Sequence, residues 1–219
     1  MNKIHNMLSL YFIAGTQDCL HLNNNPEINL LCVLRQALQA GITCFQFRDK
    51  GKGSLEHTPE RQKALAIQCR DLCREYGVPF IVNDNVELCL AIDADGLHIG
   101  QSDCAIQNIP AELRQKRILG LSVNNLEQAL ENKDHEDIDY FGIGPIFPTR
   151  SKTDHLPALG LEFISLLRRH EVNKPCVAIG GITADIASRL RRLGVDGVAV
   201  ISAITQAPDI QHAVRQLSR

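Results

Sequence analysis

Short apolar runs alternate with amphipathic stretches along the whole chain, and this alternation limits its fold more than any other feature. The apolar runs have the length of buried strands and cover residues 9–14, 42–47, 79–83, 95–99, 117–121, 139–143, 175–179 and 196–200. Helical periodicity follows them at residues 27–40, 59–76, 85–93, 109–115, 125–132, 160–170, 183–192 and 203–217. Strict alternation with short connections predicts parallel strands that are joined by right-handed crossovers.

Eight strand–helix units of about 27 residues each account for the 219 residues. Eight units favour a closed (β/α)8 TIM barrel of the α/β class, with an open doubly wound sheet as the alternative. Gly41, Gly77 and Gly194 support the predicted helix ends, because each stands where a left-handed residue ends a helix. No linker interrupts the pattern, so we predict a single domain over residues 1–219.

Three local features lead to finer predictions. Asp84 and Thr183 precede predicted helices, and their short polar side chains are suited to capping the first N–H groups. The polar segment 16–26, TQDCLHLNNNP, is typical of an extended loop after the first strand.

The balance of charge argues against two classes of partner. The chain has 23 Lys and Arg against 25 Asp and Glu, without a block of like charges. Nucleic acids and membrane surfaces usually require a concentrated basic face, so we expect neither as a partner. The chain has no apolar run that could span a bilayer, and the eight cysteines lack disulfide or zinc spacing. We therefore expect a cytoplasmic protein with free, buried thiols.

The second predicted strand carries a polar face into the mouth of the barrel. Side chains alternate along a strand, so Gln46, Arg48 and Lys50 lie opposite Phe45 and Phe47. The two phenylalanines are suited to packing against the helices, which turns the polar set inward. The C-terminal ends of barrel strands carry the chemistry in this fold, so these residues become candidates for binding or catalysis. A solvated strand end with surface cations is the alternative.

Two carboxylates follow neighbouring strands. Asp84 comes after the third predicted strand and Asp103 after the fourth. Mg²⁺ favours oxygen ligands and often takes one or two carboxylates together with substrate phosphates. The pair therefore predicts a Mg²⁺ site opposite the cationic strand, although each residue is also suited to capping a helix.

Three further loops have groups that suit phosphate oxygens. Residues 142–154, GIGPIFPTRSKTD, carry Thr149, Ser151 and Lys152. Residues 179–183, IGGIT, have two adjacent glycines, and Ser202 begins the last predicted helix. Phosphate often binds at the loops after the seventh and eighth barrel strands, so we expect one anion site beside the metal and a second built from backbone. His98 could polarise a substrate or be structural, and both interpretations stay open.

These segments, taken in order, resemble the thiamine phosphate synthase family. QFRDK at 46–50 resembles the family's QxRxK motif, and residues 82–103 resemble the block that follows it. GLSVNN, GIGPIFPTRSKTD, AIGGIT and GVAVISAI match the later blocks, so the similarity runs from about residue 10 to residue 210. Two departures are Ser151, where family members often have Thr, and the first strand ending in AGTQDC.

The resemblance implies a Mg²⁺-dependent transferase that joins a hydroxymethylpyrimidine diphosphate to a thiazole phosphate, with release of diphosphate. It implies that the pyrimidine diphosphate is bound by Gln46, Phe47, Arg48, Asp49, Lys50, Asn83, Ser122 and Lys152. It assigns Mg²⁺ to Asp84 and Asp103, and the thiazole phosphate to Thr149, Arg150, Ser151, Gly181, Ile201 and Ser202. Arg48, Lys50 and Lys152 would be the catalytic residues, because the leaving diphosphate gains negative charge as its bond breaks.

Two other functions compete with this one. A related thiazole tautomerase shares the barrel and the thiazole phosphate site, and a non-catalytic sensor would bind the same ligands without turnover. The full diphosphate and metal set argues against both. A homo-oligomer is compatible with the sequence, which does not determine the oligomeric state.

Overall fold

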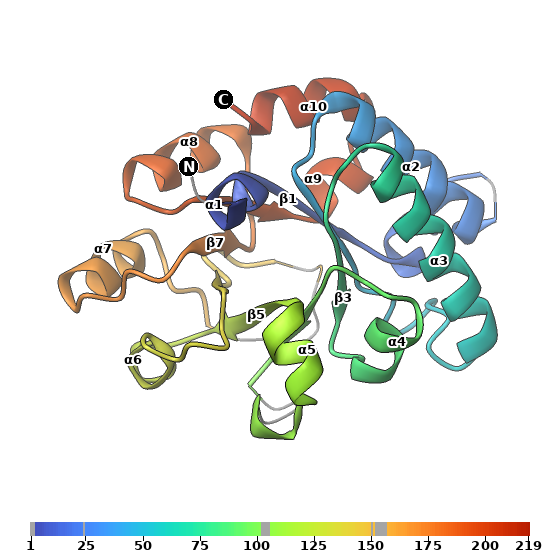
Figure 1. Ribbon diagram of the computed structural model, residues 1–219. Coiled ribbons are helices and arrows are strands. Elements are labelled where there is room, and N and C mark those ends of the chain that lie inside the picture. Colours follow the sequence, from blue (N-terminus) through green and yellow to red (C-terminus); the bar gives the residue numbers. More distant parts are fainter. Residues whose placement is uncertain (1–2, 24, 102–105, 150, 152–156) are drawn as a thin grey trace.

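Eight parallel strands close into a barrel in the computed structural model, which describes residues 3–23, 25–101, 106–149, 151 and 157–219 (Figure 1). The strands are β1 (Leu10–Ala14), β2 (Cys44–Phe47), β3 (Phe80–Asn83), β4 (Gly96–Ile99), β5 (Ile118–Val123), β6 (Tyr140–Ile143), β7 (Cys176–Ile179) and β8 (Gly197–Val200). Each strand pairs with the next, and β8 returns to β1, where Val198 lies opposite Leu10. The predicted (β/α)8 barrel is confirmed, and the closing pair of strands excludes the open sheet.

Helices surround the barrel and connect its strands (Figure 1). They are α1 (Lys3–Leu8), α2 (Pro26–Ala40), α3 (Pro59–Glu75), α4 (Val86–Ala91), α5 (Ala111–Lys116), α6 (Leu126–Asn132), α7 (Glu162–Arg169), α8 (Ala184–Arg192), α9 (Ser202–Thr205) and α10 (Ile210–Leu217), with 3₁₀ turns η1 (Thr16–Cys19) and η2 (Ile106–Asn108). Gly41, Gly77 and Gly194 have φ values of 101°, 65° and 96°, so the predicted left-handed helix ends are confirmed.

Two predicted elements differ from the structure, and one observed helix was not predicted. The helix predicted over 203–217 is two helices, α9 and α10, because Pro208 disfavours helix at the residue before it and the Asp209 side chain caps α10 by accepting from His212 N–H. The segment 16–26 is not an extended loop, since η1 occupies its beginning and α2 starts at Pro26. Helix α1 precedes β1 and was not predicted.

Two hydrophobic layers follow from the alternation of side chains along the strands. Phe12, Phe45 and Phe80 point outward beneath the helices, with ring centroids 5.4 and 5.9 Å apart along the row. Tyr11 and Cys44 belong to a separate cluster in the barrel interior, which also includes Met7 and Leu8 of α1. Only Ser9 separates α1 from β1, so the apolar side chains of this helix close the N-terminal end of the barrel. Ile42 packs in the outer layer, because β2 begins only at Cys44.

The N-terminal end of the barrel repeats one hydrogen bond four times. A polar residue directly before each even-numbered strand accepts from a backbone N–H at the start of the preceding strand. Thr43 Oγ1 accepts from Leu10, and Asp95, Asp139 and Asp196 accept from Phe80, Leu119 and Cys176, at 2.7–2.9 Å. These bonds satisfy N–H groups where the strands begin and join the strands in pairs.

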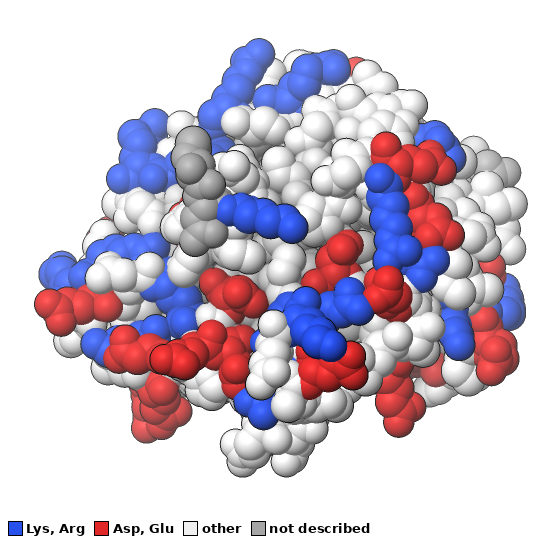
Figure 2. All heavy atoms as spheres, viewed as in Figure 1, with Lys and Arg blue, Asp and Glu red and all other residues white. Residues whose placement is uncertain are grey.

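Charged side chains of both signs are mixed over most of the face shown in Figure 2, which has the same view as Figure 1. Basic side chains are more concentrated toward the upper left, where α8 ends in Arg189, Arg191 and Arg192. Among the described residues, none of the helices is both long enough and apolar enough to cross a membrane.

Candidate functional site

A cavity of about 650 Å³ opens at the C-terminal end of the strands. Its walls come from the ends of β3 and of β5 to β8, and from the loops that follow β2 to β8. Of the predicted site residues, the cavity is lined by Arg48, Lys50, Asn83, Asp84, Ser122, Thr149, Ser151, Gly181, Ile201 and Ser202. The structure therefore brings most of the predicted set together around one space.

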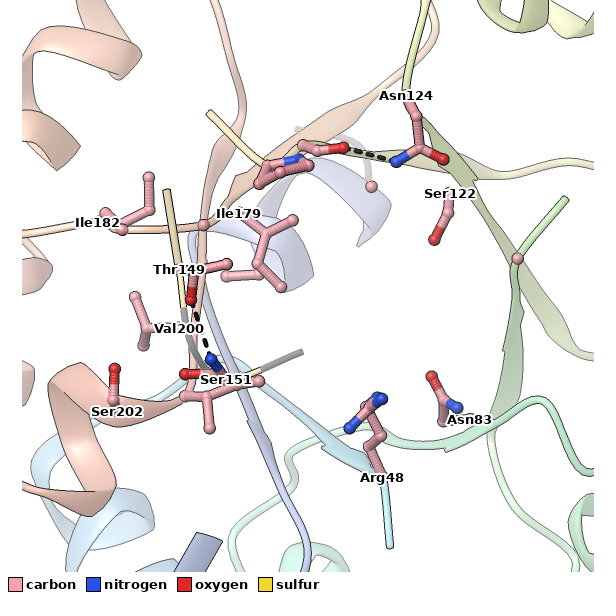
Figure 3. A pocket seen from close by; sticks show the side chains of 18 of the residues that line it. Arg48, Asn83, Ser122, Asn124, Thr149, Ser151, Ile179, Ile182, Val200 and Ser202 are labelled. Carbon is pink, nitrogen blue, oxygen red and sulfur yellow. Dashed lines mark hydrogen bonds between the residues drawn. The ribbon is translucent and has the colours of Figure 1, made fainter. Parts of the chain in front are cut away.

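One side of the cavity carries charged and amide groups. Arg48 and Asn83 extend toward the open space in Figure 3. Lys50 Nζ lies 2.8 Å from Asp84 Oδ2, which neutralises part of the charge of this carboxylate. Asp84 has a left-handed backbone, with φ of 59°, and its N–H donates to the His98 carbonyl at 2.8 Å. The turn at the end of β3 therefore holds the carboxylate at the cavity wall.

The expected capping role of Asp84 is wrong. The first N–H groups of α4 are capped by Asn85, whose side chain accepts from Leu88 N–H at 2.8 Å. Asp84 stands one residue before the N-cap position, which Asn85 occupies. Thr183 does occupy the N-cap position of α8, but its side chain makes no capping bond.

Asp49 does not line the cavity, in contrast to its predicted contact with substrate. Its carboxylate is buried and accepts from Thr16 N–H at 2.8 Å, from Leu55 N–H at 2.9 Å and from the Gln62 amide at 3.1 Å. The alternation of the strand turns it away from Arg48, its neighbour in sequence. Asp49 instead ties the end of β2 to the loops beside it.

Phe47 and Gln46 also lie outside the cavity wall. Phe47 packs in the outer layer against Phe80, with ring centroids 6.3 Å apart, so its ring points away from this cavity, and its contact with substrate stays a prediction. Gln46 points into the barrel as predicted, but it lies one step below the mouth. It is 2% exposed, and its Nε2 donates to Tyr11 Oη at 3.0 Å.

The opposite side of the cavity carries hydroxyl groups. Figure 3 shows Thr149, Ser151 and Ser202 on the side away from Arg48 and Asn83, with Ile179 and Val200 nearby. The Ser151 N–H donates to Thr149 Oγ1 at 3.2 Å. The cavity thus has two polar regions, a cationic one and a hydroxyl-rich one.

Gly180 and Gly181 form the turn next to the hydroxyl-rich region. Their φ values of 100° and 63° are in the left-handed range, which favours glycine. A Cβ on Gly181 would lie 2.8 Å from Phe147 Cβ, and one on Gly180 would lie 2.7 Å from Pro145 Cβ. The two glycines therefore allow the loop after β6 to pack on the loop after β7.

Three predicted residues lie outside the described residues: Asp103, Arg150 and Lys152. Their predicted roles in binding metal and phosphate stay predictions. Among the residues that the structure describes, no group of three or more His, Cys, Asp or Glu could hold a metal ion. Asp84 is a suitable oxygen ligand at the cavity wall, and substrate phosphates could complete such a site.

Comparison with known proteins decides the family. The sequence profile described as "Thiamine monophosphate synthase" matches residues 10–204. The chain belongs to this family. A thiamine-phosphate synthase from Mannheimia succiniciproducens is 58% identical over 219 residues, which are 100% of each chain. One from Haemophilus influenzae is 60% identical over 217 residues, covering 99% of this chain and 96% of the relative.

A solved structure agrees with these sequence relatives. A thiamine phosphate pyrophosphorylase from Pyrococcus furiosus superposes with a TM-score of 0.81 at 35% identity, covering 98% of this chain and 95% of the other. As a member of the thiamine monophosphate synthase family, the chain is an enzyme of the transferase class.

Two residues at the cavity or behind it were not predicted from the sequence. Asn124 lines it just beyond β5, and its side chain donates to the Gly144 carbonyl at 2.6 Å. Gln17, in the segment taken for an extended loop, donates to the Arg48 carbonyl at 2.6 Å and so supports the cationic region. The polar pair NN in GLSVNN was a signal for Asn124, whereas nothing in the sequence indicated the contact of Gln17.

The buried cysteines are unsuited to act as nucleophiles. Six of the seven are buried, and Cys32 is exposed. Burial raises the pKa of Cys19 and of Cys89 to about 12, so these side chains remain thiols at neutral pH. The expected buried free thiols are therefore present, with Cys32 as the exception among the described residues.

Proposed function

We propose that this enzyme condenses 4-amino-2-methyl-5-hydroxymethylpyrimidine diphosphate with a thiazole phosphate, giving thiamine phosphate and diphosphate, and that the reaction depends on Mg²⁺. One observation carries the proposal: a single cavity has Arg48 and Lys50 on one side and Thr149, Ser151 and Ser202 on the other. Two substrates that each carry phosphate need two such regions, and the reacting carbon and nitrogen must meet between them.

The reaction requires a leaving group to be stabilised. The bond between the pyrimidine methylene carbon and the diphosphate oxygen breaks, and the oxygen leaves with the electron pair. The thiazole nitrogen then supplies its lone pair to the same carbon. Charge grows on the leaving diphosphate, so Arg48 and Lys50 bind the transition state more strongly than the ground state. We assign the same role to Lys152.

No general base has to be found in the cavity. The attacking thiazole nitrogen carries no proton, so its lone pair is available without a proton transfer. What the protein has to supply is the placement of two substrates, and the two polar regions do this by holding each phosphate at its own end of the cavity. We place the thiazole phosphate against Thr149 to Ser151, Gly181 and Ile201–Ser202, since the first N–H groups of a helix such as α9 have no acceptor within the helix.

Asp84 and Asp103 would hold the Mg²⁺ ion. When bound, the ion neutralises charge on the diphosphate. Asp84 fits this use because its carboxylate lies at the cavity wall beside Lys50. A cytoplasmic location and the absence of nucleic-acid partners stay predictions.

The test combines the purified enzyme with both substrates, with Mg²⁺ or with a chelator. We expect diphosphate and thiamine phosphate to appear in equal amounts, only when both substrates and Mg²⁺ are present. Release of diphosphate without loss of the thiazole would indicate hydrolysis. Isomerisation of the thiazole phosphate alone would indicate a tautomerase, and binding without turnover would indicate a sensor. Each of these three outcomes contradicts the proposal.

A variant pair tests the metal assignment separately. Asp84→Asn keeps the shape of the side chain and removes its charge, so the Mg²⁺ concentration for half-maximal activity should rise. Asp93→Asn is the matched control, because Asp93 is an exposed residue that pairs with Arg74 and Arg117 away from the cavity. An unchanged Mg²⁺ dependence in Asp84→Asn would remove this residue from the metal site.

A further inference from the structure

A chain of hydrogen bonds runs through the barrel interior and ends at the cavity. Gln46 Nε2 donates to Tyr11 Oη at 3.0 Å, and Tyr11 Oη lies 2.7 Å from Tyr140 Oη. Tyr140 Oη is 3.1 Å from His98 Nδ1, and His98 Nε2 is 3.0 Å from Ser122 Oγ. Ser122 lines the cavity, whereas the other four side chains are buried.

The bond from Gln46 to Tyr11 determines which group donates in each of the other bonds. Burial raises the pKa of both Tyr11 and Tyr140 well above the usual range, so both keep their phenolic proton. Tyr11 Oη already accepts from Gln46, and its own proton needs an acceptor. The neighbouring Cys44 sulfur is a weak acceptor, so the Tyr140 oxygen is the better one. Tyr11 therefore donates to Tyr140.

The same reasoning assigns the donor and acceptor of each bond between Tyr140 and the cavity. Tyr140 accepts from Tyr11 and donates its own proton to His98 Nδ1. An imidazole whose Nδ1 accepts carries its proton on Nε2, which then donates to Ser122 Oγ. The serine oxygen accepts this bond, which leaves its own O–H to point at an acceptor in the cavity.

The surrounding backbone is shaped to hold these rings. The His98 and Tyr140 rings lie 5.5 Å apart, and Tyr140 lies 5.9 Å from Tyr11. A Cβ on Gly120 would lie 2.2 Å from Tyr140 Cζ and 2.5 Å from His98 Nδ1. The absence of a side chain at Gly120 of β5 thus leaves room for the two rings to meet.

We propose that His98 is a positioning residue, which Tyr140 holds in the Nε2–H tautomer so that the Ser122 hydroxyl is a hydrogen-bond donor to substrate. Ser122 then recognises an acceptor atom, either a ring nitrogen lone pair or a diphosphate oxygen of the pyrimidine substrate. This inference rests on the proposed function for the identity of the substrate, but the tautomer of His98 is a property of the free enzyme.

The first test measures that tautomer directly. ¹⁵N-labelled enzyme without substrate is studied by NMR correlation of the imidazole nitrogens with the ring protons, and the His98 signals are assigned by their loss in His98→Gln. We expect a neutral ring that is protonated at Nε2. A ring protonated at Nδ1, or at both nitrogens, would overturn the inference. An enzyme without turnover would instead contradict the proposed function and leave this measurement intact.

The second test removes one oxygen from the chain. Tyr140→Phe should free the tautomer of His98 and lower kcat/KM for the pyrimidine diphosphate on the order of three- to tenfold, the worth of one neutral hydrogen bond. The KM of the thiazole phosphate should not change. Tyr76→Phe is the matched control, because Tyr76 lies at the end of α3 and is 38% exposed. Equal effects of the two changes would contradict the inference.

A third comparison separates donation from the filling of space. His98→Gln supplies an amide N–H that can still donate to Ser122, whereas His98→Leu has a similar size and no donor. The Gln variant should retain several-fold more of the wild-type kcat/KM than the Leu variant. Equal losses in two folded variants would show that the ring only fills space.

Discussion

The two ends of the barrel use polar residues in opposite ways. At the N-terminal end, the carboxylates of Asp95, Asp139 and Asp196 each accept from a backbone N–H of a neighbouring strand. At the C-terminal end, Arg48, Asn83 and Ser122 reach into an open cavity. The comparison teaches that polar side chains stabilise the fold where they bond to backbone groups. Where they face an open cavity, they are available to bind a ligand.

The largest expected effect comes from a cation of the cavity end. Arg48→Ala should lower kcat/KM on the order of 10²-fold or more, because it removes charge stabilisation of the leaving diphosphate. The free energy of unfolding should change little. Arg35→Ala is the matched control, since Arg35 is exposed on α2 and pairs loosely with Glu75. Steady-state assays of diphosphate release check this, and similar rates in both variants would break the comparison.

Two glycines with the same backbone angle sharpen the comparison further. Gly181 has φ of 63° and Gly77 has φ of 65°, but a Cβ on Gly77 would meet nothing within 4 Å. Both Gly→Ala changes should cost about 1–2 kcal/mol from left-handed strain. Gly181→Ala should cost more, because of its contact with Phe147, and should raise the KM of the thiazole phosphate.

Denaturant unfolding and kinetics on both glycine variants measure the difference. A Gly77→Ala variant with altered KM would show that the two ends are not separate in function. Equal losses of stability would show that the contact between the loops after β6 and β7 contributes nothing.

A change at the N-terminal end should affect stability alone. Asp139→Ala leaves the Leu119 N–H without its acceptor and should lower the free energy of unfolding by about 1–2 kcal/mol. The kcat/KM of the folded enzyme should stay at the wild-type value. Asp134→Ala, at an exposed position nearby, is the control and should be neutral. Urea unfolding and assays below the transition test both statements.

The smallest effect concerns pH. Burial raises the pKa of the Asp139 carboxyl above its ordinary value of 3.8, although the Leu119 N–H lowers it again in part. The folded protein therefore binds this proton more tightly than the unfolded chain does. The stabilising contribution is full below pH 3.8 and is lost as the pH rises through the folded pKa.

Asp139→Asn removes this titration. The stability of the wild type relative to the variant should fall as the pH rises above 3.8 and through the folded pKa of Asp139, and should then level off. Urea titrations of both proteins over this range measure the trend. A rise in relative stability with pH would contradict the assigned direction of the pKa shift.

The strand pattern of the barrel could be predicted because each strand is a short apolar run bounded by polar residues. The eight predicted runs differ from the observed strands by at most two residues at an end. The period of two along residues 44–50 also separated Arg48 and Lys50 from Phe47 and Asp49. The family resemblance assigned the whole run 46–50 to substrate, whereas alternation predicted that Phe47 packs under the helices, and the structure places its ring there.

Contacts between distant strands could not be predicted in the same way. The meeting of Tyr11, His98 and Tyr140 depends on the register of β1, β4 and β6 inside a closed barrel, and local patterns carry no information on it. Helix α1 was missed because its six residues are too few to show a helical period. The split between α9 and α10 had a visible signal in Pro208, which the periodicity of 203–217 concealed.

The central claim is that one cavity holds two phosphate groups at opposite sides. A crystal structure of the enzyme with Mg²⁺, diphosphate and thiamine phosphate tests it most directly. We expect diphosphate against Arg48 and Lys50, and the phosphate ester of thiamine phosphate against Gly181 and Ser202. Both anions bound in one of these regions, or either product bound outside the cavity, would contradict the account.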